Sequence, residues 1–390
     1  MKSFRHAAAV PLTTLAIALA AAGSPAAAQQ GVTATEIKIG GSTALTGPGA
    51  LVGIAHDLGE KIAVGEINDA GGINGRKIVR VFEDDGYVPA RTVQAARKLI
   101  DVDKVLAITA SSGTASTMAA LPLAQEKNIP MLQTAAPNTV MFTPPQKNLF
   151  VVGKAYGPGT YDFTKFLAGR FRDAKWVAIV QDDDYGDDVQ AGYERAVKEL
   201  KLNSLAVMRY KRGQKDFSAE ILRAKQLGAT LILSGAIIGE NVAIAKEAVR
   251  IGLNAQIAML WSGRIPQLIG LMGEAGKGVI AADYVGEFSD PAGQVFMEKA
   301  RKYLTADEMG KLNRYSLTGY IGVVLIADAI RRCGNTVTQA CVIEKLETTS
   351  NLSTQGITSP LSFQPGTRVS DLQLNYTTVD WDRQAWVPLK

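Results

Sequence analysis

Short apolar runs of strand length alternate with helical segments along most of this 390-residue chain. Nearly continuous apolar strands separated by helices are typical of parallel sheets covered on both faces. One intervening segment, residues 53–72, places Ile54, Leu58, Ile62 and Ile67 on one helical face and ends in Gly-Gly. The pattern predicts a doubly wound α/β fold. The first strands are expected in EIKIGGSTAL (36–45), KIVRVFEDD (77–85), KVLAITA (104–110) and IPMLQTA (129–135).

The alternation begins again after residue 155. A chain of this length exceeds one ordinary core, so two domains are expected, each with its own parallel sheet. The C-terminal part differs, because residues 291–304 and 316–333 are typical of consecutive helices, and residues 359–368 and 372–389 together are typical of a hairpin tail. The strands of the second unit are expected in WVAIVQDDD (176–184), SLAVMRY (204–210), TLILSGA (230–236), QIAMLWSG (256–263) and KGVIAAD (277–283).

The N-terminus has the pattern of a secretory signal. Lys2 and Arg5 precede a mostly apolar stretch, and Ala26 and Ala28 form an A-x-A cleavage site. A membrane anchor is the alternative, but the stretch is broken by Pro11 and is shorter than a spanning helix. We therefore expect residues 1–28 to be a signal peptide, cleaved after Ala28, and the rest of the chain to be exported.

The chain has two cysteines, Cys333 and Cys341. Because an exported chain meets an oxidising compartment, we expect a disulfide that closes a small loop between them. Two buried thiols are the alternative.

The sequence lacks the residue patterns that several kinds of catalytic and binding site require. Removing the signal leaves one histidine, His56, which we expect on the surface of an amphipathic helix, and no G-x-S-x-G motif is present, so a serine hydrolase lacks its base. Zinc clusters and P-loops have no matching pattern, and the acidic run 182–188 lacks calcium-loop spacing. The net charge of +5 is spread without a basic, aromatic-interleaved block, which disfavours nucleic acid. We expect no enzyme activity, cofactor or metal.

Ligands of open parallel sheets bind at the carboxyl ends of the strands. Four loops lie there: 109–116 (TASSGTAS), 132–138, 181–188 and 260–264. The hydroxyls and backbone N–H groups of TASSGTAS, placed where a helix begins, suit a carboxylate, and its glycine permits close approach. A strand-to-helix turn with capping serines is the alternative.

Several strings together resemble the periplasmic solute-binding proteins of the leucine-binding family. They cover nearly the whole exported chain in order: IKIGGSTALTGPGALVG (37–53), AVGEINDAGGINGRKI (63–78), FEDDGYVPARTVQAARKLI (82–100) and VQDDDYGDDV (180–189). The resemblance implies a type I periplasmic binding fold, in which two α/β lobes joined by three crossover strands close around a small ligand. It also implies delivery of that ligand to the membrane permease subunits of an ABC importer.

The resemblance places the three crossings near residues 149–157, 284–288 and 359–363. One lobe would then comprise residues 31–152 and 286–360, and the other residues 153–285 and 361–390.

The resemblance assigns the carboxylate cradle to two loops. In the first loop the matching residues are Ser111, Ser112, Gly113 and Thr114, with Thr114 the expected hydroxyl. The second loop matches with Ala135, Ala136 and Pro137, or one residue earlier with Thr134, Ala135 and Ala136. Either register lacks the family's threonine, and in the first register Pro137 also removes a backbone donor.

Two residues of the second lobe are expected to face the ligand. Tyr185 matches a tyrosine of the family, and Trp261 stands where the family has an acid that pairs with the ligand's ammonium group. Glu240 or Glu287 could replace that acid, and core packing is the alternative role for Trp261. Family members also often have an aromatic residue where Val52 stands.

We therefore expect a monomeric periplasmic binding protein for a small carboxylate. Branched-chain amino acids are the family default, but the missing acid favours an aromatic or other carboxylic acid without an amino group, because a buried ammonium without a charge partner is costly. A periplasmic sensor on the same fold is an alternative, and a secreted hydrolase using Ser111 or Ser112 is a more remote one.

Overall fold

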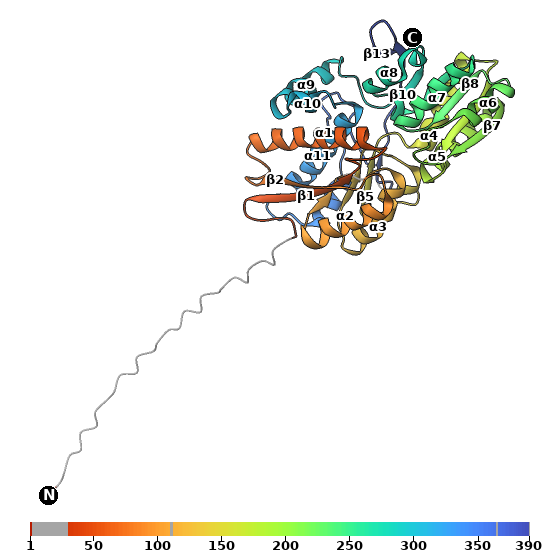
Figure 1. The fold of residues 1–390 in the computed structure, drawn as a ribbon. Coiled ribbons are helices and arrows are strands. Elements are labelled where there is room, and N and C mark those ends of the chain that lie inside the picture. The colour runs from red at the N-terminus through yellow and green to blue at the C-terminus, as the bar shows by residue number, and fades with distance from the viewer. Residues whose placement is uncertain (2–29, 110–111, 364–365, 390) are drawn as a thin grey trace.

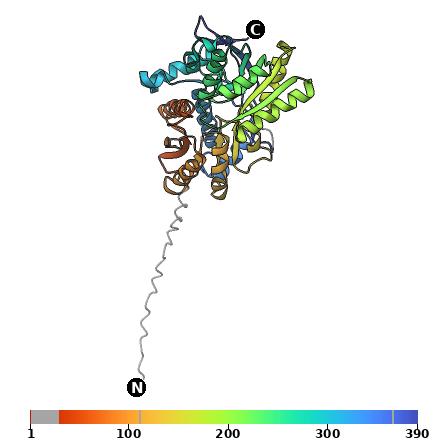
Figure 2. The ribbon, with the colours of Figure 1, turned by 45° about the vertical axis from the view of Figure 1, so that its right-hand side comes forward.

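The computed structural model describes Met1 and residues 30–109, 112–363 and 366–389. The signal peptide expected beyond Met1, and Ser111, lie outside these residues. Figures 1 and 2 show two α/β lobes side by side, each built around one sheet. The predicted fold class, two doubly wound lobes with mostly parallel sheets, is confirmed.

The first sheet has six strands, and each of its pairs is parallel. Helices from both ends of the chain cover it, including α1 (Ala50–Asp69), α2 (Pro89–Arg97), α3 (Thr114–Glu126) and α11 (Arg314–Arg332). In spatial order the strands are β11 (Val369–Ser370), β5 (Leu149–Val152), β4 (Met131–Gln133), β3 (Ala107–Ile108), β1 (Glu36–Thr43) and β2 (Lys77–Asp84).

The second sheet has seven strands, parallel from β7 to β10 and antiparallel at the other end, where β12 and β13 form a hairpin within the second of the two stretches expected for it. Its helices are α4 (Tyr156–Arg170), α5 (Asp184–Leu200), α6 (Ser218–Gln226), α7 (Ile238–Ile251) and α8 (Pro266–Met272). In spatial order the strands are β13 (Ala385–Pro388), β12 (Asn375–Asp380), β10 (Ile280–Asp283), β9 (Gln256–Met259), β8 (Leu231–Gly235), β6 (Lys175–Gln181) and β7 (Asn203–Tyr210).

The chain passes between the sheets after β5, after β10 and after β11. The first two passages lie in the expected segments 149–157 and 284–288. The third comes later than the expected 359–363, because β11 still pairs with β5 in the first sheet, and Leu361 forms an isolated bridge with Leu352. The lobe boundaries given above stay a prediction.

The segment between the second and third passages packs onto the first lobe. It holds α9 (Pro291–Tyr303), α10 (Ala306–Met309), α11 and α12 (Gln339–Glu347). Helices α1 and α11 meet through glycines: a Cβ on Gly59 would lie 1.9 Å from the Ser316 carbonyl oxygen, and one on Gly319 2.2 Å from that of His56. A disulfide joins Cys333 to Cys341, the pairing expected from the sequence. Within the described part of the chain, no helix combines the length and apolarity needed to cross a membrane.

Candidate ligand-binding cleft

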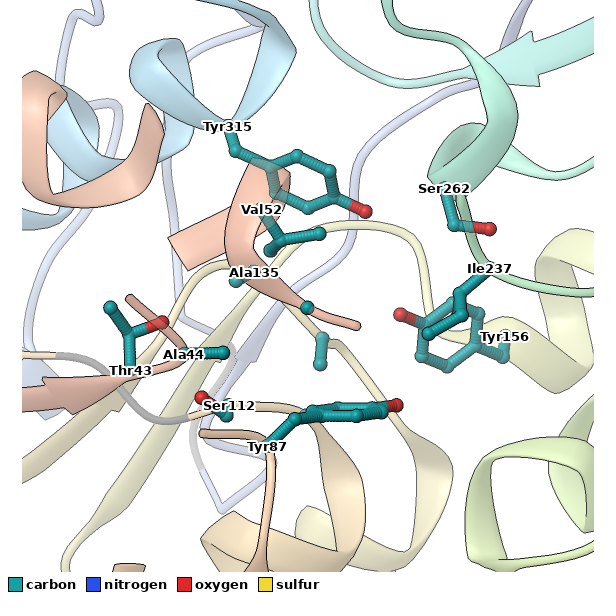
Figure 3. A pocket seen from close by; sticks show the side chains of 13 residues that line it. Thr43, Ala44, Val52, Tyr87, Ser112, Ala135, Tyr156, Ile237, Ser262 and Tyr315 are labelled. Carbon is teal, nitrogen blue, oxygen red and sulfur yellow. The ribbon is translucent and has the colours of Figure 1, made fainter. Parts of the chain in front are cut away.

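A cavity lies between the two lobes, at the carboxyl ends of both sheets (Figure 3). The space between its walls, including the part open to solvent, is about 430 Å³. The first lobe supplies most of the wall, and the second lobe supplies Tyr156, Ile237 and Ser262. The first-lobe residues are Thr43, Ala44, Gly49, Val52, Tyr87, Ser112, Gly113, Ala135, Ala136 and Tyr315.

The N-terminus of α3 forms one side of this cavity. Gly113 is the residue before the helix and has φ +91°, a conformation that glycine adopts without strain. Thr114 follows it, 4% exposed and not itself in the cavity wall, and its hydroxyl has no hydrogen-bond partner among the described residues. The Ser112 hydroxyl instead donates to the buried carboxylate of Asp85. The helix N-terminus and the free Thr114 hydroxyl together can hold an anion.

The loop after β4 presents a different wall. Ala135 and Ala136 line the cavity, but their N–H groups donate to the Gln133 side-chain oxygen, at 2.7 and 2.9 Å. Pro137 has no N–H group, so these three residues have no free backbone donor for a ligand. The Thr134 hydroxyl bonds His56 and does not line the cavity. Gln133 has thus taken over donors that the resemblance assigned to the ligand.

An aromatic cluster supports the second-lobe side. Tyr156, the first residue of α4, lines the cavity. Trp261 stacks on it with ring centroids 4.9 Å apart, and Tyr185 meets it edge-on at 4.5 Å. Tyr185 and Trp261 are both buried and neither lines the cavity. The two residues that the sequence placed against the ligand therefore lie behind Tyr156.

Three cavity tyrosines escaped the sequence reasoning: Tyr87, Tyr156 and Tyr315. Tyr87 follows the carboxyl end of β2 and Tyr315 lies in the first turn of α11, both typical positions for ligand contacts. In Figure 3 their rings lie on opposite sides of the cavity, and the Tyr156 hydroxyl points between them. Ser262 lies in the loop 260–264 that the sequence did single out.

None of the described residues that line the cavity carries a charge. Glu287, one expected substitute for the missing acid, pairs with Arg264. Glu240, the other, accepts a hydrogen bond from the Gly213 N–H at 2.9 Å. Both acids therefore have partners within the second lobe and lie outside the cavity wall.

His56 is buried, contrary to the surface position expected from its helix. It is 1% exposed, because the α11 helix packs over this face of α1. Its Nε2 lies 2.9 Å from the Thr134 hydroxyl, and its Nδ1 lies 3.7 Å from Glu60, which pairs with Arg80. Burial lowers the pKa of His56 to about 3 and raises the pKa of Glu60 to about 7. A neutral His56 therefore supports the loop after β4.

His56 is expected to make the fold sensitive to acid. Because its folded-state pKa lies below the unfolded value of 6.5, the unfolded chain binds the proton first, and stability is lost as pH falls from 6.5 towards 3. Glu60 has the opposite effect on stability: its pKa is 4.5 in the unfolded chain and about 7 in the folded protein, so the folded protein gains stability as the pH falls between these values. The His56→Gln variant should therefore lose less stability than the native protein between pH 6 and 4, by about 1.4 kcal/mol per pH unit. Urea unfolding at both pH values measures this, and equal losses in the two proteins would contradict it.

Among the described residues, no group of three or more histidine, cysteine or acidic side chains is placed to hold a metal ion. Two α/β lobes with a cavity between the carboxyl ends of their sheets define a two-lobed ligand-binding protein. Residues 36–382 match the family described as periplasmic binding protein, and the chain belongs to that family. This family consists of substrate-binding proteins, and the resemblance seen in the sequence is confirmed.

Known proteins place the chain near the leucine-binding type. It is 27% identical over 327 residues to the leucine-, isoleucine-, valine-, threonine- and alanine-binding protein of Pseudomonas aeruginosa, covering 83% of this chain and 84% of that protein. A branched-chain amino acid ABC transporter protein from Thermus thermophilus with bound valine has a TM-score of 0.82 at 21% identity, covering 91% of this chain and 96% of its own. A solute-binding protein from R. palustris in complex with 4-hydroxybenzoate has a TM-score of 0.79 at 21% identity, covering 90% and 95%. These solved structures share the fold.

Proposed function

We propose that this protein is the substrate-binding component of a periplasmic ABC importer, and that its ligand is a small carboxylic acid without an amino group, aromatic acids being the favoured class. The protein acts as a monomer, exported by residues 1–28, and its lobes close around the acid before it passes to the membrane permease. The lobe boundaries predicted from the sequence belong to this proposal, with the last boundary moved from residue 361 to beyond β11, which still pairs in the first sheet.

The uncharged cavity wall carries the proposal. An amino acid would bring an ammonium group into the cleft, and the described residues that line it offer no carboxylate. Burying an ammonium group without a charge partner costs several kcal/mol. A carboxylate also needs compensation when it is buried, but the N-terminus of α3 can supply it through backbone N–H groups and the positive end of the helix dipole.

The same wall suits the rest of such a ligand. The carboxylate can lie at the N-terminus of α3 and accept from the Thr114 hydroxyl, which has no partner in the described part of the chain. The body of the acid then meets Val52, Ala135 and the ring of Tyr156, which Trp261 backs. Aromatic rings favour stacked and edge-on neighbours, so an aromatic acid uses this wall well.

The related proteins support both ligand classes. The P. aeruginosa relative is named for aliphatic amino acids, and the R. palustris neighbour holds 4-hydroxybenzoate. The composition of the cavity is what favours the second class for this chain.

Thermal unfolding with added ligands tests the proposal. Benzoate and 4-hydroxybenzoate should raise the melting temperature, since a ligand at one hundred times its Kd stabilises the folded state by about 2.7 kcal/mol. L-leucine and L-valine at the same concentrations should shift it little. A strong shift with leucine or valine and none with the aromatic acids would contradict the proposed ligand class.

A further inference from the structure

Arg212 reaches from the second lobe onto a cavity residue of the first. It lies in the loop after β7, and its Nη1 donates to the Tyr87 carbonyl oxygen at 2.8 Å. Its guanidinium carbon lies 4.1 Å from the centre of the Tyr87 ring. One side chain thus makes a charge-assisted hydrogen bond and a cation–π contact across the cleft.

The second lobe holds this guanidinium firmly. Its Nη2 pairs with Asp183 at 2.5 Å, and Asp183 also caps α5 by accepting from the Tyr185 and Gly186 N–H groups. Arg212 is therefore anchored to the start of a long helix of its own lobe.

The contacted residue is part of the ligand site. Tyr87 lines the cavity, and a Cβ on Gly113 would lie only 2.9 Å from its ring. The Tyr87 N–H donates to Asp85, which also accepts from the Ser112 hydroxyl. Arg212 therefore contacts the loop after β2, and hydrogen bonds through Asp85 connect this loop to Ser112 on the anion-binding side of the cavity.

The contact lies far from the hinge. Strands β2 and β7, which precede Tyr87 and Arg212, are the outermost strands of their sheets. The crossings lie beside β5 and β11 in one sheet and beside β10 and β12 in the other, towards the opposite edges. Opening about these crossings separates the β2 and β7 edges most, so Arg212 must leave Tyr87 before a ligand can escape.

We propose that Arg212 is the positioning residue that keeps the cleft closed and sets the rate of ligand release. This proposal rests on the proposed binding function, but it does not depend on which acid or amino acid binds. Entry occurs through the open form, in which the contact is absent, so the association rate should change little.

The test compares Arg212→Met with Arg209→Met. Arg209 lies in β7, three residues before Arg212, and pairs with Asp182 and Asp187 of its own lobe, and no interlobe contact of its side chain is seen among the described residues. Stopped-flow displacement of bound 4-hydroxybenzoate, or of L-leucine if the melting screen selects that ligand, measures dissociation. Arg212→Met should release the probe about tenfold faster with a nearly unchanged association rate, and Arg209→Met should behave as the native protein. Arg212→Lys keeps the charge but loses the planar guanidinium group, so its dissociation rate should lie between those of Arg212→Met and the native protein.

Small-angle scattering of the ligand-free proteins is a second test, which requires no bound ligand. Arg212→Met should have a larger radius of gyration than Arg209→Met, because its lobes are more open. If none of the probes binds the native protein, the proposed function fails and scattering alone decides this inference. Equal dissociation rates in the two variants, or equal scattering where no probe binds, would overturn the role of Arg212.

Discussion

Replacing Asp283 with asparagine is expected to lower the free energy of unfolding by about 3–5 kcal/mol. Asp283 ends β10, is 1% exposed, and accepts from the Nε atoms of Arg264 and Arg314 at 2.5 and 2.6 Å. In the variant, Arg264 would still pair with Glu287. Arg314, at the start of α11, would lose Asp283, its carboxylate partner in the described part of the chain. The neutral amide would leave a buried guanidinium uncompensated, beside the hinge between the lobes.

Urea unfolding of Asp283→Asn beside Asp182→Asn measures this effect. Asp182 also pairs with an arginine, Arg209, but is 57% exposed, so its replacement should cost less than about 1 kcal/mol. Equal losses in the two variants would show that burial of the Asp283 pair is not what stabilises this region.

Replacing Thr114 with valine is expected to weaken ligand binding about 10- to 100-fold, with the stability of the free protein almost unchanged. A hydrogen bond to a charged group contributes about 1.5–3 kcal/mol, and the Thr114 hydroxyl has no partner to lose among the residues that the structure describes. Valine keeps the shape of the side chain at the start of α3. Isothermal titration with the ligand selected by the melting screen measures the affinity.

Thr117→Val is the matched control one helical turn later. The Thr117 hydroxyl donates to the Gly113 carbonyl oxygen at 2.9 Å and accepts from Gln133 at 2.7 Å. Its loss should therefore lower stability by about 1–3 kcal/mol, because Gln133 is left with an unmade bond. If Thr114→Val loses stability but no affinity, its hydroxyl has a structural role and the predicted cradle is wrong.

The alternation of apolar runs and helices was sufficient to predict both sheets, because a strand that is buried on both faces consists almost entirely of apolar residues. It was also sufficient to choose the carboxyl-end loops, and Ser112, Gly113, Ala135 and Ala136 do line the cavity. The third passage between the lobes was placed too early. Its position depends on β11 pairing with β5, a contact between distant segments that no local pattern reveals.

The roles of individual side chains were harder to predict. His56 has the spacing of a helix surface, yet α11, more than 250 positions further along the chain, buries it. The ring of Tyr156 stands between the cavity and the pair Tyr185 and Trp261. These three aromatic residues come from separate segments, the start of α4, the start of α5 and the loop after β9, and only the folding of the second lobe brings them together.

By itself, the sequence determined the two α/β lobes, the cysteine pair and three loops that contribute to the cavity wall, and it led us to expect an export signal, since each follows from local composition or spacing. Only the tertiary structure decided which groups in those loops stay free. The Gln133 side chain accepts from the Ala135 and Ala136 N–H groups, while the Thr114 hydroxyl has no partner among the described residues. It also brought Arg212 onto Tyr87. The physical reason is that a hydrogen-bonding group serves a ligand only when no protein partner has taken it, and those partners come from distant parts of the chain.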